Sequence, residues 1–417
     1  MAADAATNGP AHGLESRRPW QGRRVLLGVS GGIAAYKAIQ LARDLTKRGA
    51  IVETILTHSA RAFVGAISFE ALTGRPVHDD ILAEGHALSH IRLAREADAV
   101  CVAPATADLL ARAAAGRADD LLTAVLLATR APVILCPAMN DAMWSHAQTV
   151  ANVAHLEHLG YHIAGPAEGA LAHGEGEGPG RMLEPAVILE HIGRALTPAG
   201  PLRDRRVVVT AGPTREAVDP VRVLSNRSSG RMGYEIAAAA WRRGADVHLI
   251  AGPVHLPDPV GVQVQHVETA DQMAGALRAV LPAANVLVMA AAVADFRPAS
   301  AAQTKIRRKD GPAAIPLAPA TDVLAATRDA RPAGLLAVGF ALETGDGRAS
   351  ARRKLEDKAL DLIVLNDATE AGAGFEVDTN HVVLIDRNGV EQDVPLMPKS
   401  EVAEVLLDRV ASLLERS

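Results

Sequence analysis

The 417-residue chain has little of four things: aromatic residues, cysteine, excess charge of one sign and long apolar runs. Aromatic residues are 3% of the chain, so aliphatic side chains must fill its interior. Its two cysteines, Cys101 and Cys136, lie in apolar, strand-like runs, which predicts buried thiols, argues against a disulfide framework and favours the cytoplasm. A formal net charge of -5 argues against a nucleic-acid binder, and no apolar run reaches membrane-spanning length.

What is present suffices for two hydrophobic cores. Hydrophobic residues at 49% and charged residues at 22% are typical of globular proteins, and 417 residues exceed one ordinary core. Residues 1–20 lack the apolar centre of a signal peptide, which predicts a disordered tail. A proline- and glycine-containing stretch at residues 197–204 is the best linker candidate, so we expect domains at 21–196 and 205–417.

From Arg24 onward, short aliphatic runs alternate with amphipathic segments, the pattern of βαβ units around a parallel sheet. The predicted strands are residues 24–29, 51–57, 99–103 and 132–136, then 205–212, 246–252, 285–293, 335–342 and 361–367. Helices are predicted at residues 32–49, 185–196 and 232–244. The expected fold class is α/β, with two tandem Rossmann-like three-layer domains, the first of them flavodoxin-like.

Glycine and polar residues follow the predicted strands of the first domain. The run GVSGGIAAYK places Ser30, Gly31 and Gly32 between a strand and a helix, where amides and the helix dipole favour a phosphate, although such turns also serve packing. The run is not a GxGxxG fingerprint, so a mononucleotide such as FMN fits better than NAD. Asn140 follows a buried strand, where α/β sheets place their chemistry, whereas a lone histidine such as His90 is more often structural.

A glycine-rich segment, GALAHGEGEGPGRML, occupies residues 169–183. Such sequence loses much backbone entropy on ordering, which leaves open either a solvated linker or a flap over a site.

The order of SGGIAAYK, SHIRL, APATADLLA, PAMN and GEGPGRM resembles flavin-dependent phosphopantothenoylcysteine decarboxylases over about residues 22–195. The resemblance implies an FMN site that includes Gly31, Gly32, Thr57, Ala105 and Thr106, and Ser30 is predicted to belong to it from its place in the same turn. It also makes His90 an acid/base group near the substrate and Asn140 the residue that binds the substrate carboxylate. By the same resemblance, the glycine-rich segment is the substrate clamp.

The clamp departs from the family pattern at His173, where family members carry a cysteine. In the family mechanism FMN oxidises the substrate thiol, carbon dioxide is lost, and the clamp cysteine donates the proton that accompanies the returned hydride. An imidazole titrates near neutrality and is suited to the same task. We hypothesise that His173 replaces the thiol as general acid; the alternative is that another group or water does so.

The second domain carries denser motifs. TAGPTREAVDPVRVLSNRSSGRMG places hydroxyls and amides before a predicted helix, at an N-terminus suited to phosphate. MAAAVADFRP follows the most apolar strand with small residues and then Asp295. The basic run that begins at Lys305 is either a solvated loop or a polyphosphate contact, and Lys354 and Lys358 share one helix face.

These motifs, with VGFALET, resemble phosphopantothenate-cysteine ligases over about residues 205–415. The resemblance implies a CTP site at Ala291, Asp295, Lys305, Thr321, Asp322, Val323, Leu324, Phe340, Lys354 and Lys358. It assigns Asn226 and Arg222 to an acyl-cytidylate intermediate, with Mg²⁺ assisting and no metal ligands identified.

Together the two resemblances match the bacterial fused enzymes that perform both steps in coenzyme A biosynthesis. They imply small-molecule substrates, namely 4'-phosphopantothenate, cysteine and CTP, and a homo-oligomer with trimers of the first domain, dimers of the second and a dodecamer as the larger assembly. One alternative is an active ligase whose first domain binds FMN without complete turnover. A tandem nicotinamide dehydrogenase is disfavoured because the dinucleotide fingerprint is absent.

Overall fold

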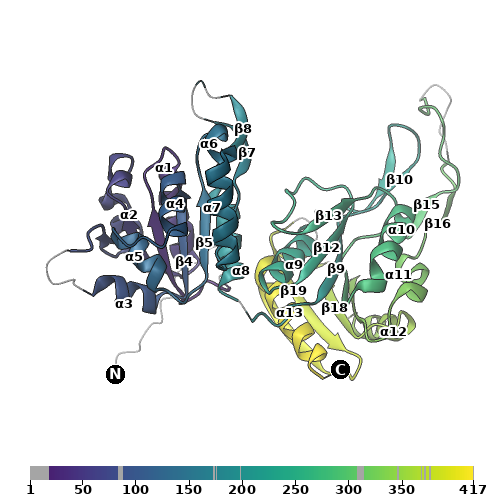
Figure 1. Cartoon of the computed structure of the whole chain (residues 1–417). Coiled ribbons are helices and arrows are strands. Elements are labelled where there is room, and N and C mark those ends of the chain that lie inside the picture. Colours follow the sequence, from purple (N-terminus) through teal and green to yellow (C-terminus); the bar gives the residue numbers. More distant parts are fainter. Residues whose placement is uncertain are drawn as a thin grey trace, which may run out of the picture. The chain divides into compact units, whose positions relative to one another are not determined.

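The computed structural model describes residues 18–82, 88–171, 174, 176–197, 199–307, 314–344, 347–367, 369–370, 372–374 and 377–416. The described part divides into two compact units, one within Arg17–Pro198 and the other within Ala199–Ser417 (Figure 1). Residues 1–17 of the predicted tail lie outside the described residues. None of the helices in these ranges combines the length and apolar character needed to cross a bilayer.

The first unit is built on a parallel sheet of order β3-β2-β1-β4-β5-β6. Its strands are β1 (Arg24–Val29), β2 (Ile51–Leu56), β3 (Val77–His78), β4 (Ala99–Ala105), β5 (Val133–Pro137) and β6 (His162–Ile163). Strands β4 and β5 are buried along their whole length, as expected of a sheet covered on both faces. The strand order reverses between β1 and β4, because the chain first adds strands on one side of β1 and then on the other. Doubly wound sheets bind ligands at such a point, at the carboxyl ends of the strands.

Helices cover both faces of this sheet. The helices are α1 (Ala35–Lys47), α2 (Ala66–Thr73) and α8 (Pro185–Ala195) on one face, and α3 (Ser89–Glu96), α4 (Ala107–Ala114), α5 (Leu121–Ala128) and α7 (Ala147–His158) on the other. Leu41 and Leu45 of α1 pack with Phe69 and Ile188 in one core cluster. Cys101 and Cys136 are buried and free in the same cluster, as predicted.

Shorter elements complete the first unit. They are the 3₁₀ turn η1 (Ser59–Ala62), the helix α6 (Asp141–Ser145) and the strands β7 (Ala167–Ala170) and β8 (Glu177–Arg181). Strands β7 and β8 pair antiparallel, so the glycine-rich segment forms a hairpin. Figure 1 shows this hairpin beside α6, which it contacts.

The second unit has the sheet order β13-β12-β9-β14-β17-β18-β19-β20. Its strands are β9 (Arg206–Ala211), β12 (Asp246–Ala251), β13 (Gln263–His266), β14 (Val286–Met289), β17 (Leu336–Glu343), β18 (Leu362–Asp367), β19 (Thr379–Asp386) and β20 (Glu391–Pro398). The strands from β13 to β18 run parallel, and β19 and β20 are added antiparallel. The Rossmann-like expectation is thereby confirmed for both units.

Helices again sandwich the sheet. On one face lie α9 (Arg231–Arg242) and α13 (Lys399–Leu414), and on the other α10 (Ala270–Val280), α11 (Val323–Ala326) and α12 (Arg348–Asp357). A buried ion pair joins α9 to α13, with Arg243 Nη2 2.7 Å from Glu404 Oε2. The 3₁₀ turns are η2 (Leu281–Ala283) and η4 (Arg328–Ala330), and the hairpin strands are β10 (Arg215–Ala217), β11 (Val223–Ser225), β15 (Phe296–Pro298) and β16 (Leu317–Pro319).

Gly233 and Gly275 are both helical but have opposite surroundings. A Cβ on Gly233 of α9 would lie 2.5 Å from Ala211 Cβ, whereas one on Gly275 of α10 would meet no described atom within 4 Å. We expect Gly233→Ala to lower the free energy of unfolding by about 1–3 kcal/mol through overpacking. Gly275→Ala is the matched control and should raise it by about 0.4–1 kcal/mol. Thermal unfolding of the full chain checks both, and a stabilised Gly233→Ala protein would contradict the close helix–strand contact.

Candidate functional site

Hydroxyl side chains follow neighbouring strands at the carboxyl edge of the first sheet: Ser30 after β1, Thr57 after β2 and Thr106 after β4. Ser30 Oγ donates to the carbonyl of Pro104 (2.7 Å) and accepts from the backbone N–H of Thr106 (3.1 Å). These bonds tie the loops after β1 and β4 together across the point where the strand order reverses. The structure therefore brings these predicted flavin residues to one edge, next to Ala105 at the end of β4.

The two glycines of the first turn have different reasons to be glycine. A Cβ on Gly31 would lie 2.4 Å from Ser59 Cβ, so packing alone requires glycine there. A Cβ on Gly32 would make only an ordinary contact, 3.5 Å from Thr106 Cγ2. Helix α1 then begins at Ala35 without a side-chain cap from any described residue. The amides of Ala35 and Lys37 already donate to backbone carbonyls, so an anion such as the phosphate of FMN would have to use the other amides of this turn.

His90 is the second residue of α3 and is half-buried. Its Nδ1 atom is buried and has no hydrogen-bond partner among the described residues. A buried polar atom left without a partner costs free energy, so this atom is the notable feature of His90. No described hydrogen bond joins His90 to the flavin-edge residues, and its role as an acid/base group stays a prediction from the sequence.

Asn140 lies in the loop after β5 and caps the short helix α6, with its Oδ1 accepting from the N–H of Ala142 (2.8 Å). The glycine-rich hairpin packs directly on this loop, because the N–H of Met139 donates to the carbonyl of Gly180 (3.0 Å). A Cβ on Gly180 would lie 2.2 Å from the Met139 carbonyl oxygen. Glycine is therefore needed for close backbone approach, and the segment predicted as a clamp lies beside Asn140. His173 lies outside the described residues.

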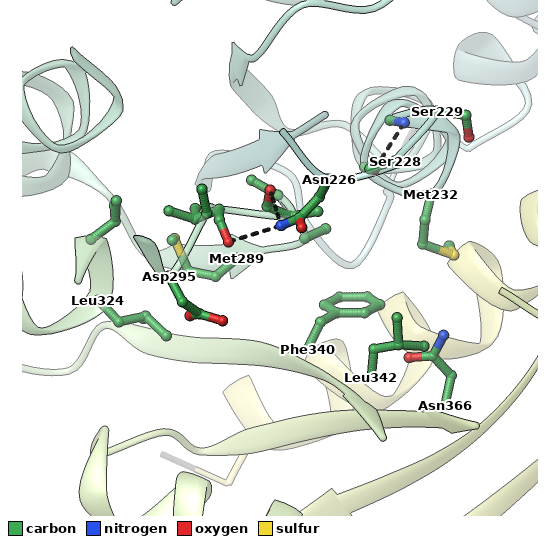
Figure 2. A pocket seen from close by; sticks show the side chains of 18 of the residues that line it. Asn226, Ser228, Ser229, Met232, Met289, Asp295, Leu324, Phe340, Leu342 and Asn366 are labelled. Carbon is green, nitrogen blue, oxygen red and sulfur yellow. Dashed lines mark hydrogen bonds between the residues drawn. The ribbon is translucent and has the colours of Figure 1, made fainter. Parts of the chain in front are cut away.

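A cavity of about 600 Å³ lies in the second unit, at the carboxyl edge of its sheet (Figure 2). Every nucleotide residue predicted for this unit except Lys305 lines it, namely Ala291, Asp295, Thr321, Asp322, Val323, Leu324, Phe340, Lys354 and Lys358. Figure 2 shows Phe340, Leu342 and Asn366 along one side and Asn226 and Ser228 along the other. The volume is that of a nucleotide-sized pocket.

Asn226 fixes one wall of this cavity. Its Nδ2 donates to the carbonyls of Ala292 and Val293, each at 3.1 Å. On the strand side, the N–H of Ala291 donates to Thr210 Oγ1 (3.2 Å). Both amide hydrogens of Asn226 are thus bonded to the wall, so donation to a reacting oxyanion requires the side chain to release one carbonyl.

The lysines of α12 supply positive charge at the cavity. Lys354 Nζ donates to the carbonyl of Phe340 (2.8 Å), and burial lowers the pKa of Lys354. Lys358, one turn further along, pairs with Asp322. Burial of Asp322 opposes its ionisation, but the hydrogen bond from Lys358 helps to keep the pKa of Asp322 below its ordinary value. Two ammonium groups on one helix face are suited to a polyphosphate.

Arg331 joins the two elements that carry these charges and was not predicted from the sequence. Its guanidinium donates to the carbonyl of Leu324 in α11 (2.8 Å) and to the carbonyl of Lys358 at the end of α12 (3.1 Å). No motif marks this arginine, because its role depends on the approach of α11 to α12.

The residues that line the cavity at its end between α9 and α13 were also not predicted from the sequence. They include Met232, Asn366, Gly374, Asn380 and Lys399. Lys399 is buried, and its Nζ donates to the carbonyl of Gly374 (2.8 Å). Burial, with repulsion from Arg231, lowers the pKa of Lys399 to about 8. The N-terminus of α9 also faces this end of the cavity, and its helix dipole adds positive potential there.

Arg222 and Lys305 do not belong to the set of described residues that line the cavity. Arg222 Nη2 donates to the carbonyl of Ile306 (3.1 Å), next to Lys305 in sequence, and the N–H of Ile306 donates to Asp219 Oδ2 (3.2 Å). The structure thus brings Arg222 and the Lys305 segment together, away from the cavity wall. In the described ranges, no group of three or more histidine, cysteine, aspartate or glutamate residues is arranged to hold a metal ion.

Two family models match the chain. The Flavoprotein model matches residues 14–197, and the model for the DNA/pantothenate metabolism flavoprotein C-terminal domain matches residues 202–414. The chain is also 49% identical to the coenzyme A biosynthesis bifunctional protein CoaBC of Mycobacterium tuberculosis, over 94% of this chain and 97% of the relative. The chain belongs to the family of coenzyme A biosynthesis bifunctional proteins CoaBC. It is 43% identical to the corresponding Escherichia coli protein, over 94% of this chain and 97% of that one.

Among solved structures, the C-terminal domain of a coenzyme A biosynthesis bifunctional protein CoaBC is 34% identical, covers 52% of this chain and 100% of that one, and has a TM-score of 0.45. Family membership confirms the predicted function class, coenzyme A biosynthesis by a decarboxylase and a ligase on one chain. The Flavoprotein match supports FMN as the cofactor of the first unit.

Proposed function

We propose that the second unit joins 4'-phosphopantothenate to cysteine at the expense of CTP, and that the first unit decarboxylates the product to 4'-phosphopantetheine with FMN. The observation that carries the ligase half is the cavity of about 600 Å³ in which Lys354, Lys358 and Lys399 face a wall of small residues. Small residues admit a flat ligand, and the ammonium groups suit its phosphates.

A carboxylate does not form an amide in water without an activated leaving group. We infer that the phosphopantothenate carboxylate attacks the α-phosphorus of CTP and expels pyrophosphate, which forms an acyl-cytidylate. Lys354 and Lys358 offset the charge that develops on the phosphates. The amine of cysteine then attacks the acyl carbon and releases CMP, with Asn226 serving the oxyanion. Roles for Arg222 and Lys305 stay predictions from the sequence.

Mg²⁺ would accompany the triphosphate rather than occupy a site made by the protein alone. Magnesium usually binds through one or two carboxylates together with substrate phosphates and waters. Asp295 is a carboxylate in the cavity wall and is the residue we propose for this contact.

In the first unit, bound FMN would supply the oxidation of the substrate thiol and the later return of the hydride. Ser30, Thr57 and the amides at the start of α1 would hold it at the sheet edge. His90 would exchange a proton with the substrate, and Asn140 would bind the substrate carboxylate under the glycine-rich hairpin. His173 remains the sequence-based choice for the last proton donor.

We also propose that the protein works in the cytoplasm as a homo-oligomer, with trimers of the first unit, dimers of the second and a dodecamer as the larger assembly. Exposed apolar side chains support contacts between copies: Ile33, Tyr36 and Ile67 are 71%, 61% and 75% exposed in the first unit, and Val221 is 64% exposed in the second. Light scattering on the purified full chain tests this, and a monomer would refute it.

The decarboxylase half is tested by supplying the purified protein with synthetic 4'-phosphopantothenoylcysteine and identifying the product by mass spectrometry. We expect 4'-phosphopantetheine. Accumulation of the oxidised, decarboxylated enethiol would instead favour the alternative of an incompletely active first unit. A flavin absorbance spectrum that does not change on addition of NADH would distinguish both of these functions, the complete and the incomplete decarboxylase, from a nicotinamide dehydrogenase.

Nucleotide binding should depend on pH through Lys399. Because its pKa is about 8 in the empty cavity and a bound triphosphate favours the charged lysine, binding should take up protons near pH 8 and weaken as the pH rises further. The folding linkage has the opposite sign: from about 8 to 10.5 the unfolded state holds the extra proton, so the free energy of unfolding rises with pH. Calorimetry of CTP binding in two buffers of different ionisation enthalpy measures the uptake. It should shrink in Lys399→Gln, and equal uptake in both proteins would contradict the assignment.

A further inference from the structure

Lys37 is a buried lysine to which the chemistry above gives no task. It lies in α1, its side chain is 8% exposed, and its Nζ donates to the carbonyl of Met182 (3.1 Å) and to Glu184 Oε1 (3.0 Å). Its helix neighbour Tyr36 is by contrast largely exposed. Burying a charged lysine costs free energy unless hydrogen bonds compensate. The two acceptors of Lys37 therefore indicate which part of the chain the lysine holds in place.

Both acceptors lie in the short link between β8 and α8, directly after the glycine-rich hairpin. Strand β8 ends at Arg181, so the Met182 carbonyl is the first backbone acceptor after it. Glu184 also accepts from Arg181 Nη2 (2.5 Å), and the hydrogen bond from Lys37 is the main cause that lowers the pKa of Glu184. The lysine therefore binds the end of β8 both through the backbone and through an ionised carboxylate.

The same short stretch of chain is fixed to the Asn140 loop. Two residues before Met182, the carbonyl of Gly180 accepts from the N–H of Met139 (3.0 Å). Lys37 itself lies in the first turn of α1, directly after the Ser30–Gly32 turn. The hairpin base is thus attached on one side to the helix that follows the flavin turn, and on the other to the loop that carries Asn140.

We propose that Lys37 is a positioning residue that sets the place of the hairpin relative to the flavin turn and Asn140. Without it, the Met182 carbonyl loses its partner, and the hairpin base keeps the bond to Met139, the packing of the Met182 side chain in the core and the contacts of β8 with α6. A substrate enclosed by the hairpin then sits less accurately. The description of the hairpin as a substrate clamp rests on the proposed decarboxylase function, whereas the attachment by Lys37 does not.

The test compares Lys37→Met with the full-length wild-type protein. Methionine replaces the apolar stem of lysine but lacks the terminal ammonium group and so cannot donate a hydrogen bond. We expect faster amide hydrogen exchange in peptides covering residues 167–182 and unchanged exchange elsewhere in the first unit, with normal flavin content. The value of kcat/KM for 4'-phosphopantothenoylcysteine should fall about 100-fold, mainly through KM, because a displacement of about 1 Å can cost this much. Lys47→Met, at the exposed end of the same helix, is the matched control and should behave like wild type.

Unchanged exchange at residues 167–182 together with a wild-type KM would overturn the proposal. Faster exchange throughout the unit with loss of flavin would also overturn it, because Lys37 would then support the fold as a whole. If Lys37→Met does not fold, Lys37→Arg is used in the same comparison, because the larger guanidinium group must displace the hairpin base. Faster amide exchange confined to residues 167–182 would support the proposal. Faster exchange elsewhere, or no change in exchange, would refute it. A wild-type protein that makes no 4'-phosphopantetheine would refute the proposed function, while the exchange comparison would still decide the attachment.

Discussion

Replacing Asn226 with aspartate is expected to slow amide formation by about 100- to 1000-fold, the cost of removing one oxyanion donor. An ionised carboxylate has no hydrogen to donate. In this position it would also face the carbonyls of Ala292 and Val293, which the amide now contacts at 3.1 Å. We therefore expect some loss of CTP affinity, but a much larger loss of phosphopantothenoylcysteine formation. Pyrophosphate release without cysteine and product formation with cysteine measure the two half-reactions separately.

The controls for this prediction separate charge from position. Asn226→Ala removes the donors without adding a charge and should lose amide formation with less effect on CTP affinity. Asn388→Asp makes the same chemical change in an exposed turn and should leave both half-reactions unchanged. If Asn226→Asp formed the amide at the wild-type rate, the proposed role of Asn226 would be wrong.

The second large effect is expected in the other unit, where His90→Asn should slow decarboxylation by about 100- to 10,000-fold, the usual contribution of a general acid or base. Asparagine keeps a hydrogen-bonding side chain but cannot carry a proton between groups near neutral pH. The buried Nδ1 of His90 has no partner among the described residues, so the substitution removes no visible structural bond at that atom. Flavin content should stay at the wild-type level. Carbon dioxide release from 4'-phosphopantothenoylcysteine is the direct measurement.

His155→Asn on the exposed surface of α7 is the matched control, and its decarboxylation rate should not change. Full turnover by His90→Asn would show that the protons move through another group. If His90→Asn lost both its flavin and its turnover, His90 would support cofactor binding rather than proton transfer.

The buried parallel strands could be predicted from the sequence because they are short continuous apolar runs. The predicted strand 24–29 coincides with β1, and the runs at 246–252 and 361–367 contain β12 and β18. The predicted strand 285–293 is too long, since β14 ends at Met289 and the small residues that follow form the cavity wall. Strand β20 was not predicted, and only its Val394 is fully buried, so this edge strand carries little hydrophobic pattern. Strand β19 was also not predicted, although its residues 382–385 are apolar and buried.

The candidate site divides in the same way. Residues that directly follow parallel strands, such as Ser30 and Asn140, could be placed because the carboxyl ends of such strands share one edge. Ala291 was assigned to the nucleotide site only through the family resemblance. Lys399 and Asn380 reach the cavity from the antiparallel end of the sheet, and no sequence rule brings that end to the first strands. The family resemblance assigned Lys305 to CTP and Arg222 to the acyl-cytidylate intermediate, and neither residue is among the described residues that line the cavity.

The central claim is that one chain performs both reactions, and one incubation tests it most directly. Purified full-length protein with bound FMN is supplied with 4'-phosphopantothenate, cysteine, CTP and Mg²⁺, and all products are quantified by mass spectrometry. The account predicts 4'-phosphopantetheine, with CMP, pyrophosphate and carbon dioxide formed in equal amounts to it. If CTP were consumed without any 4'-phosphopantothenoylcysteine or 4'-phosphopantetheine, or if neither product appeared with any nucleotide, the account would be contradicted.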